Sequence, residues 1–263
     1  MSDLPVIAPS VAYYNVEQVG DISQWLDYGN LHSYSGGNLP TSGLEANIDF
    51  TRGLIGTKPY YVTETGYHTA TNNNSEVDAK WAQRGVSENA AAKYIPRLFV
   101  KYFEQGIVRT YLHYFLDRFP DPERDNQEDN FGLLRNDLSE KPSYVSLKNT
   151  IALLKDSGVG SASGGLSYSL EGDLTDIHQL LLRKQDGSFY LIVWQEVPGY
   201  DYASKSDIYH NPRKVTLKLG TQIGKGQTYL PLNGTTPVNT YTGVRSIDLE
   251  VPDHLLIVRL SGS

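Results

Sequence analysis

The chain has 263 residues, with 23 Lys and Arg against 30 Asp and Glu, which gives a formal net charge of -7. Nucleic-acid-binding proteins normally carry a basic face, so this balance argues against that class. No apolar run approaches the roughly 18 residues of a membrane span, and the first residues lack the pattern of a signal peptide. The sequence has no cysteine, which excludes disulfides, cysteine-ligated metal centres and thiol catalysis.

The first part of the chain alternates short apolar runs with segments of helical period, up to about residue 155. Four runs rich in β-branched and aromatic residues predict strands at residues 6–11, 31–34, 59–63 and 107–115. Helices are predicted near residues 19–26, at 44–54, at 87–105 and at 139–154. Four strand–helix units in this order predict parallel strands covered by helices.

Two of the predicted helices carry clear boundary signals. Ser87 is expected to cap the third helix, Gly106 to end it, and Pro96 to kink it or shift its start. Ser139 is expected to cap the fourth helix, with Pro142 in its first turn. Its apolar face is predicted to consist of Tyr144, Leu147, Ile151 and Leu154.

Residues 156–165 are rich in Gly and Ser and are predicted to link a first domain, residues 1–155, to a second, residues 166–263. Beyond this linker the pattern has period two. Residues 179–183 and 189–194 predict a hairpin that turns at Asp186-Gly187. Further strands are predicted at residues 215–219, 228–232, 238–241 and 255–260. The second domain is therefore expected to be a small antiparallel β-sandwich.

Glu64 ends a β-rich run, and Gly66 then breaks the strand. This order presents a carboxylate at the carboxyl end of a parallel strand, where α/β folds place their sites. The carboxylate can be a nucleophile, a base, a metal ligand or a simple salt-bridge partner. Taken alone, it is more often structural or solvated.

His32 and Tyr34 end the preceding predicted strand and lie two residues apart, so their side chains point to the same side. One strand away, they can reach Glu64. A phenol or imidazole donor there would orient the carboxylate and favour its ionised form, as a nucleophile requires. Two packed residues are an equally good interpretation of this pair by itself.

The segments that contain these residues resemble the second half of a retaining clan A glycoside hydrolase with a (β/α)8 barrel, most nearly of family 39. Residues 4–10 resemble the fifth barrel strand and Asn30-Leu-His-Ser-Tyr34 the sixth. Val62-Thr-Glu-Thr-Gly-Tyr67 resembles the seventh, which carries the nucleophile. Residues 109–117, followed by 130–134 and 140–144, resemble the eighth strand, its long loop and the closing helix. An appended small sandwich is also usual in such enzymes.

The resemblance implies a partial, half TIM barrel of about four β/α units followed by the sandwich. It implies that Glu64 is the nucleophile and Tyr34 its hydrogen-bonding partner. It makes His32, Tyr34, Tyr114 and Asp117 candidate residues for binding a carbohydrate substrate. It implies no cofactor and no metal for the chemistry.

One part of the family pattern is absent from the sequence. The family uses an Asn-Glu pair at the end of the fourth strand, whose glutamate is the general acid/base. Glu17 follows Tyr-Asn-Val in a polar stretch, and Glu88 opens a predicted helix, so neither fits. A complete barrel takes about 250 residues, whereas the first domain has about 155. We therefore expect a half barrel that lacks the acid/base half.

A half barrel exposes unpaired strand edges, so association is expected. The partner is expected to be an N-terminal half barrel or a second copy of the chain. Two copies would place their Glu64 residues four strands apart, whereas the family's paired glutamates lie three strands apart. Such a dimer should not recreate the spacing of about 5–5.5 Å that retaining hydrolysis needs.

Other candidate sites have weaker support. The six histidines include no zinc-binding helix pair followed by a glutamate, and no phosphate-binding glycine motif occurs. The acidic loop 121–129 can bind calcium, but it lacks the ligand spacing of an EF-hand, so a solvated loop is the better interpretation. Trp81 can stack on a sugar or pack beneath the next helix.

The leading hypothesis is a fragment of a retaining glycoside hydrolase that carries the nucleophile. The alternative is a non-catalytic carbohydrate-binding or assembly fragment, in which Glu64 does not react with a sugar. An unrelated α/β hydrolase is disfavoured because the sequence has no Gly-x-Ser-x-Gly motif.

Overall fold

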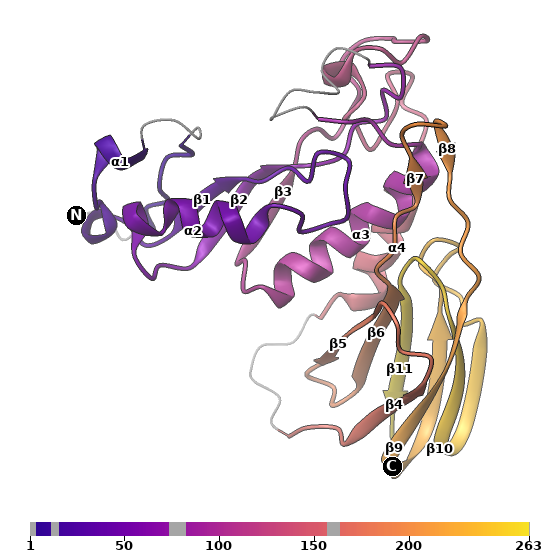
Figure 1. The fold of residues 1–263 in the computed structure, drawn as a ribbon. Coiled ribbons are helices and arrows are strands. Elements are labelled where there is room, and N and C mark those ends of the chain that lie inside the picture. Colours follow the sequence, from indigo (N-terminus) through magenta and orange to yellow (C-terminus); the bar gives the residue numbers. More distant parts are fainter. Residues whose placement is uncertain (1–3, 12–15, 74–82, 157–163, 263) are drawn as a thin grey trace. The chain divides into compact units, whose positions relative to one another are not determined.

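The computed structural model describes residues 4–11, 16–73, 83–156 and 164–262 (Figure 1). The chain divides into two units, of which the first consists of the residues up to Ser87 and of Leu98–Glu140. The second consists of Glu88–Arg97 and Lys141–Ser263, so the long helix α3 (Glu88–Glu104) contributes to both. The boundary predicted at residue 155 stays a prediction, and most of the predicted linker lies outside the described residues. None of the described helices is long and apolar enough to cross a membrane.

A parallel three-stranded sheet forms the centre of the first unit (Figure 1). Its order is β1 (Gly29–His32), β2 (Tyr60–Thr65) and β3 (Arg109–Leu112). The strand predicted at residues 6–11 is reduced to a single parallel bridge between Ile7 and Tyr28, beside the start of β1. Strand and helix alternate along the chain, which confirms the predicted half-barrel fold class.

Apolar side chains from the sheet and its helices make the core of this unit. Helix α2 (Leu44–Ile55) buries Leu54 and Ile55, and Val62 of β2 is fully buried. Gly29 admits the close approach of Ile55, because a Cβ there would lie 2.0 Å from the Cδ1 atom of that side chain. The second half of α3 adds the fully buried Leu98. Pro96 does not interrupt α3, which runs unbroken from Glu88, so the start is not shifted. A kink at Pro96 stays a prediction.

The prediction of one helix near residues 19–26 is wrong. The structure has a four-residue helix α1 (Val16–Val19) and a separate 3-10 turn η1 (Ser23–Trp25). Gly20 lies between them with a φ of 71°, which ends the first piece. The Asp21 carboxylate then accepts the backbone N–H of Ser23 at 2.8 Å and starts a new turn.

The capping residue and the buried face predicted for the fourth helix also need correction. Helix α4 (Pro142–Leu154) starts after Lys141, while the Ser139 hydroxyl donates to Asp137 at 2.6 Å. Of the predicted apolar face, Leu147 is buried but Ile151 is exposed. The buried face is composed mainly of small residues: Ser143, Ser146, Leu147 and Thr150. Proline at the first helical position is as predicted.

The second unit is built on a largely antiparallel sheet. Its strands are β4 (Tyr168–Gly172), β5 (Ile177–Arg183), β6 (Phe189–Gln195), β9 (Arg213–Tyr229), β10 (Asn239–Val251) and β11 (Leu256–Ser261). The order is β10-β9-β11-β6-β5, and β4 pairs with β9. A short hairpin, β7 (Tyr200–Asp201) and β8 (Ser206–Asp207), stands apart from this sheet. The predicted hairpin is confirmed as β5 and β6.

Strand β9 lets this sheet fold on itself. Its first half pairs with β4 and its last residues pair with β11, while β10 runs along its other side. The β9–β10 register shifts between Val244 and Ser246. The sequence predicted two strands, at residues 215–219 and 228–232, where the structure has one long irregular strand.

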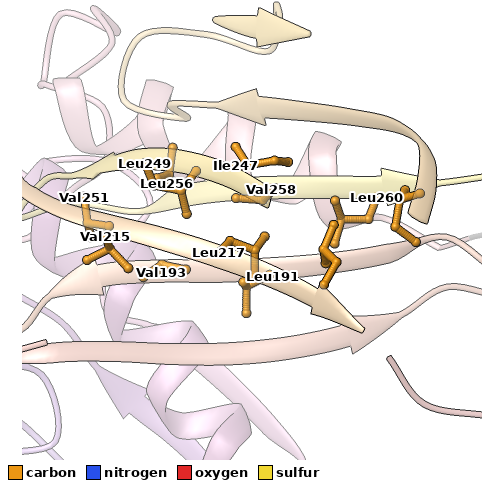
Figure 2. Packing of buried hydrophobic residues seen from close by; sticks show 12 residues of the cluster. Leu191, Val193, Val215, Leu217, Ile247, Leu249, Val251, Leu256, Val258 and Leu260 are labelled. Atoms are coloured by element: carbon orange, nitrogen blue, oxygen red, sulfur yellow. The ribbon is translucent and has the colours of Figure 1, made fainter. Parts of the chain in front are cut away.

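Twelve apolar residues of β6, β9, β10 and β11 pack into one buried cluster. Figure 2 shows side chains such as Leu191, Leu217 and Val258 filling the space between the strands. They recur at every second position, so each strand turns one face toward this core. The cluster is the interior expected of an antiparallel sandwich.

Arg97 of α3 is a fully buried cation of the second unit. Its Nη1 atom donates to the backbone oxygens of Gln195 at 2.8 Å and Asp253 at 3.0 Å. One turn earlier, Lys93 forms an ion pair with Asp253 at 2.6 Å. These contacts fasten the first turns of α3 to the strand ends of the same unit.

Candidate active site

Glu64 lies near the carboxyl end of β2, in the middle of the three parallel strands. The ladder with β1 is irregular there, because Leu31 pairs with Val62 but His32 pairs with Glu64. The ladder with β3 also shifts across this point. Such bulges redirect a side chain and are common beside active sites. The Glu64 side chain is 31% exposed, so a ligand can reach it.

Tyr34 makes the shortest contact to this carboxylate. Its hydroxyl donates to Oε1 of Glu64 at 2.5 Å. Burial, followed by the hydrogen bond and the charge of Glu64, raises the pKa of Tyr34 far above its usual value. The phenol therefore keeps its proton at every working pH and remains a donor. The Tyr34 ring is held edge-on against Phe131, with 5.7 Å between the centroids.

His32 approaches the other oxygen of Glu64. Its Nδ1 atom lies 3.4 Å from Oε2, and its Nε2 atom lies 3.2 Å from the Thr63 hydroxyl oxygen. The Thr63 hydroxyl proton is already donated to the side-chain oxygen of Asn30 at 2.7 Å. Nε2 must therefore donate to Thr63.

His113 follows β3 and faces two carboxylates. Its Nδ1 atom lies 4.0 Å from Glu64 and its Nε2 atom lies 3.6 Å from Glu128. The ring also lies edge-on to Phe131, with 5.4 Å between the centroids. Glu64 thus has an imidazole from the strand on each side of it, and Glu128 is a second carboxylate of the same cluster.

A network of side-chain hydrogen bonds fixes the loop that presents Glu128. The loop contains the 3-10 turn η2 (Gln127–Asp129), and Asn126 caps it by accepting the Glu128 N–H at 3.0 Å. Asp121 accepts the Asn126 N–H at 3.0 Å and the Asn130 amide at 2.6 Å. The position of Glu128 is therefore set by the loop itself and does not depend on a ligand.

The backbone behind Glu64 and Tyr34 is equally well fixed. The Ser33 carbonyl accepts the hydroxyls of Thr65 at 2.5 Å and of Tyr102, from α3, at 3.1 Å. Gly66 lets the strand end pass close to the next strand, because a Cβ there would lie 2.8 Å from the His113 carbonyl oxygen. These contacts fix the backbone that positions the side chains of Glu64 and Tyr34.

The two remaining predicted substrate residues differ in their surroundings. Tyr114 is half-buried and its ring packs on His113, with 3.4 Å between the centroids, so it borders the site. Asp117 is buried, and its Oδ1 atom accepts the Gly132 N–H at 2.7 Å. That contact supports the loop that carries Phe131. A substrate-binding role for either residue stays a prediction.

The structure gives no support to the metal alternatives within the part of the chain that it describes. No group of three or more His, Asp or Glu side chains there is arranged to hold an ion. The acidic residues of loop 121–129 are instead used in the hydrogen bonds that shape it. Trp81, the residue considered for sugar stacking, lies outside the described residues.

Sequence reasoning missed His113, Glu128 and Phe131 as members of the cluster. His113 carried a usable signal, because it follows the third parallel strand and so belongs to the same sheet edge as Glu64. Glu128 and Phe131 are separated from that strand by a long loop. Their place depends on how the loop folds back, which no local pattern indicates.

The sequence itself matches no protein-family model and no curated protein. Its fold, however, is similar to solved glycoside hydrolases. A family 39 glycoside hydrolase from the gut symbiont Bacteroides cellulosilyticus aligns with a TM-score of 0.58 and 18% identity, over 91% of this chain and 45% of that one. The GH51 arabinofuranosidase from Xanthomonas axonopodis pv. citri aligns with a TM-score of 0.55 and 12% identity, over 99% and 59%.

The GH39 enzyme from the same Xanthomonas gives a TM-score of 0.52 and 15% identity, over 99% of this chain and 60% of that one. At such identities the likeness is one of fold. The chain spans only 45% to 60% of the length of these three structures. The predicted resemblance to clan A glycoside hydrolases is confirmed at the level of the fold.

Proposed function

We propose that this chain carries the nucleophilic half of a retaining glycosidase site, with Glu64 as the nucleophile and a carbohydrate as the substrate. The observation that carries the proposal is the hydrogen bond of 2.5 Å from Tyr34 to Glu64, at the carboxyl end of a parallel sheet. A carboxylate held by a phenol that never loses its proton is fixed in orientation, as a nucleophile requires. The fold likeness to glycoside hydrolases supports the same reaction class.

In the first step, an oxygen of Glu64 forms a bond to the anomeric carbon of the sugar. The bond between that carbon and the leaving oxygen breaks, and its electron pair departs with the oxygen. Water then attacks the same carbon in a second step: the bond to the Glu64 oxygen breaks, its electron pair restores the carboxylate, and the proton that the water loses balances the one that the departed oxygen takes up. Tyr34 and His32 each contact one oxygen of Glu64, so they orient the carboxylate for the attack.

Covalent labelling tests Glu64 directly. The full chain is incubated with 2-deoxy-2-fluoro glycosides that carry a dinitrophenyl leaving group, for a panel of sugars. This leaving group departs without a proton, so the first step needs no general acid. Peptide mass spectrometry then locates the adduct. We expect a single sugar on Glu64 and none on the Glu64→Gln variant.

Glu104, an exposed glutamate at the end of α3, supplies the matched control. The Glu104→Gln variant should be labelled like the unaltered chain. Labelling at a different residue, or no labelling of Glu64 by any sugar of the panel, contradicts the nucleophile assignment. The non-catalytic binding alternative would then be the better interpretation.

We further propose that the Glu128 carboxylate contacts hydroxyl groups of the sugar. A carboxylate accepts several hydroxyl hydrogen bonds, and Glu128 joins the cluster through His113. Glu128→Gln should still be labelled on Glu64 but should need a higher glycoside concentration for half-maximal rate. A fall in the maximal rate without a change in that concentration would contradict a binding role.

The two outer edges of the three-stranded sheet in the first unit favour association with further strands. Val6 and Ile7 lie at one edge, Val108 and Tyr111 at the other, and all four are exposed. We infer that these edges pack against further barrel strands, either a complementary half barrel that supplies the acid/base or a second copy. Light scattering over a range of concentrations tests the second copy: a dimer supports it, and a monomer throughout contradicts it.

A further inference from the structure

A pocket in the second unit is separate from the Glu64 cluster and belongs entirely to the antiparallel sheet and its connections. Its volume is about 360 Å³. Small-molecule sites in proteins commonly measure roughly 300–1,000 Å³, so the pocket is large enough for a small ligand. Its lining includes Asn239 and Tyr241 from the start of β10 and Asp248 and Glu250 from its end. The folded β9–β10 ribbon thus brings both of its ends to one place.

The pocket combines an apolar surface with polar acceptors. Val238 is largely exposed and Tyr241 half-buried, and both line it together with Leu, Pro and Thr side chains. The acceptors come from Asn239, Asp248 and Glu250. A sugar ring matches such a surface, since its C–H face is apolar and its hydroxyl groups donate hydrogen bonds at the edge.

These acceptor groups can take further hydrogen bonds. Asp248 accepts one bond from the Thr216 hydroxyl at 2.8 Å, and the Asn239 amide nitrogen donates to Thr228 at 3.3 Å. The Asn239 oxygen remains available. Across the described ranges, no ion pair engages Glu250, although Lys214 lies opposite it in the β9–β10 ladder. A ligand can therefore use these groups without displacing an internal ion pair.

The lining carries two carboxylates and no lysine or arginine. His254, which also lines the pocket, has a buried Nδ1 atom without a hydrogen-bond partner. Burial lowers the pKa of His254, so its imidazole adds no positive charge near neutral pH. The two carboxylates of the lining disfavour an anionic ligand and leave neutral or cationic ones.

We propose that this pocket is a second carbohydrate-binding site, which takes a short neutral saccharide by packing a ring face on Tyr241 and accepting hydroxyls at Asp248, Glu250 and Asn239. The site retains a glycan and does not cleave it. The inference does not depend on the role of Glu64, since all the residues that carry it belong to the other unit.

Calorimetric titration of the full chain tests this site. All proteins carry Glu64→Gln, which stops turnover at the proposed nucleophile. The probes are xylotetraose, cellotetraose, mannotetraose and laminaritetraose, with spermidine as a cationic probe. We expect one of the four saccharides to bind and Glu250→Gln or Tyr241→Ala to weaken it about tenfold or more, the usual scale for losing a hydrogen bond to a charged group or a packed ring.

Glu171→Gln serves as the matched control, because Glu171 is an exposed strand glutamate of β4 that does not line the pocket. It should leave the affinity unchanged, and thermal melting should show that Glu250→Gln is folded. The proposal is overturned if no saccharide binds or if spermidine alone binds. It is also overturned if binding is lost in Glu128→Gln and kept in Glu250→Gln, since the saccharide would then occupy the Glu64 cluster.

Discussion

Removal of the Tyr34 hydroxyl is the most direct test of how the site is organised. Tyr34→Phe keeps the ring that packs against Phe131 and deletes the donor that lies 2.5 Å from Glu64. A hydrogen bond to a charged group contributes about 1.5–3 kcal/mol. Glu64 is 31% exposed, so water replaces part of the loss, and the lower half of that range applies. Since about 1.4 kcal/mol is a factor of ten in rate, labelling should slow by about 10- to 50-fold.

The assay is the labelling rate of Glu64 at saturating fluoroglycoside, followed by mass spectrometry. Tyr67→Phe is the matched control, because the Tyr67 hydroxyl donates to the Asn38 carbonyl at 2.8 Å and is not bonded to Glu64. That variant should keep its rate. A normal maximal rate in Tyr34→Phe, with the fold intact by circular dichroism, would refute the claim that the phenol orients a nucleophile.

Three further predictions concern stability. Arg97→Met should lower the free energy of unfolding by about 2–4 kcal/mol in urea titrations, because two buried carbonyls lose their donor; a loss below about 0.5 kcal/mol would contradict this. Gly66→Ala should lower the free energy of unfolding by about 1–3 kcal/mol and slow the labelling of Glu64, since the new Cβ would lie 2.8 Å from the His113 carbonyl oxygen. An unchanged free energy of unfolding and an unchanged labelling rate would contradict the steric argument. The pKa of His254 is lowered in the folded chain, so stability should fall as the pH drops below about 6.5, where only the unfolded chain gains the proton. Urea titrations at pH 7.5 and 5.5 should show a smaller loss in His254→Phe, and an equal loss would contradict the assignment.

The sequence alone determined the order and type of most elements. Strong periodicity predicted α2, α3, the hairpin of β5 and β6, and the end of β2 at which Glu64 stands. It also predicted that His32 and Tyr34 point to one side, and the structure brings both to Glu64. Such features depend on neighbours along the chain, where side-chain direction follows directly from the period of the strand or helix.

Local patterns failed where packing decided the outcome. Helix α4 buries Ser143, Ser146 and Thr150 and exposes Ile151, which no hydrophobic period predicts. Strand β9 continues through a glycine-rich stretch because β4, β10 and β11 supply its hydrogen bonds on both sides. Tertiary pairing can therefore override a local signal for a turn.

The tertiary structure alone assembled the groups that come from distant segments. A bulge in β2 aligns Glu64 with His32, and the folded loop after β3 returns Glu128 to His113. The pocket at the ends of β10 likewise exists only because the β9–β10 ribbon folds over. In the sequence, residue type and strand period indicate which side chains are available for chemistry. Contacts between residues far apart in sequence, which depend on register and loop closure, decided which of them meet.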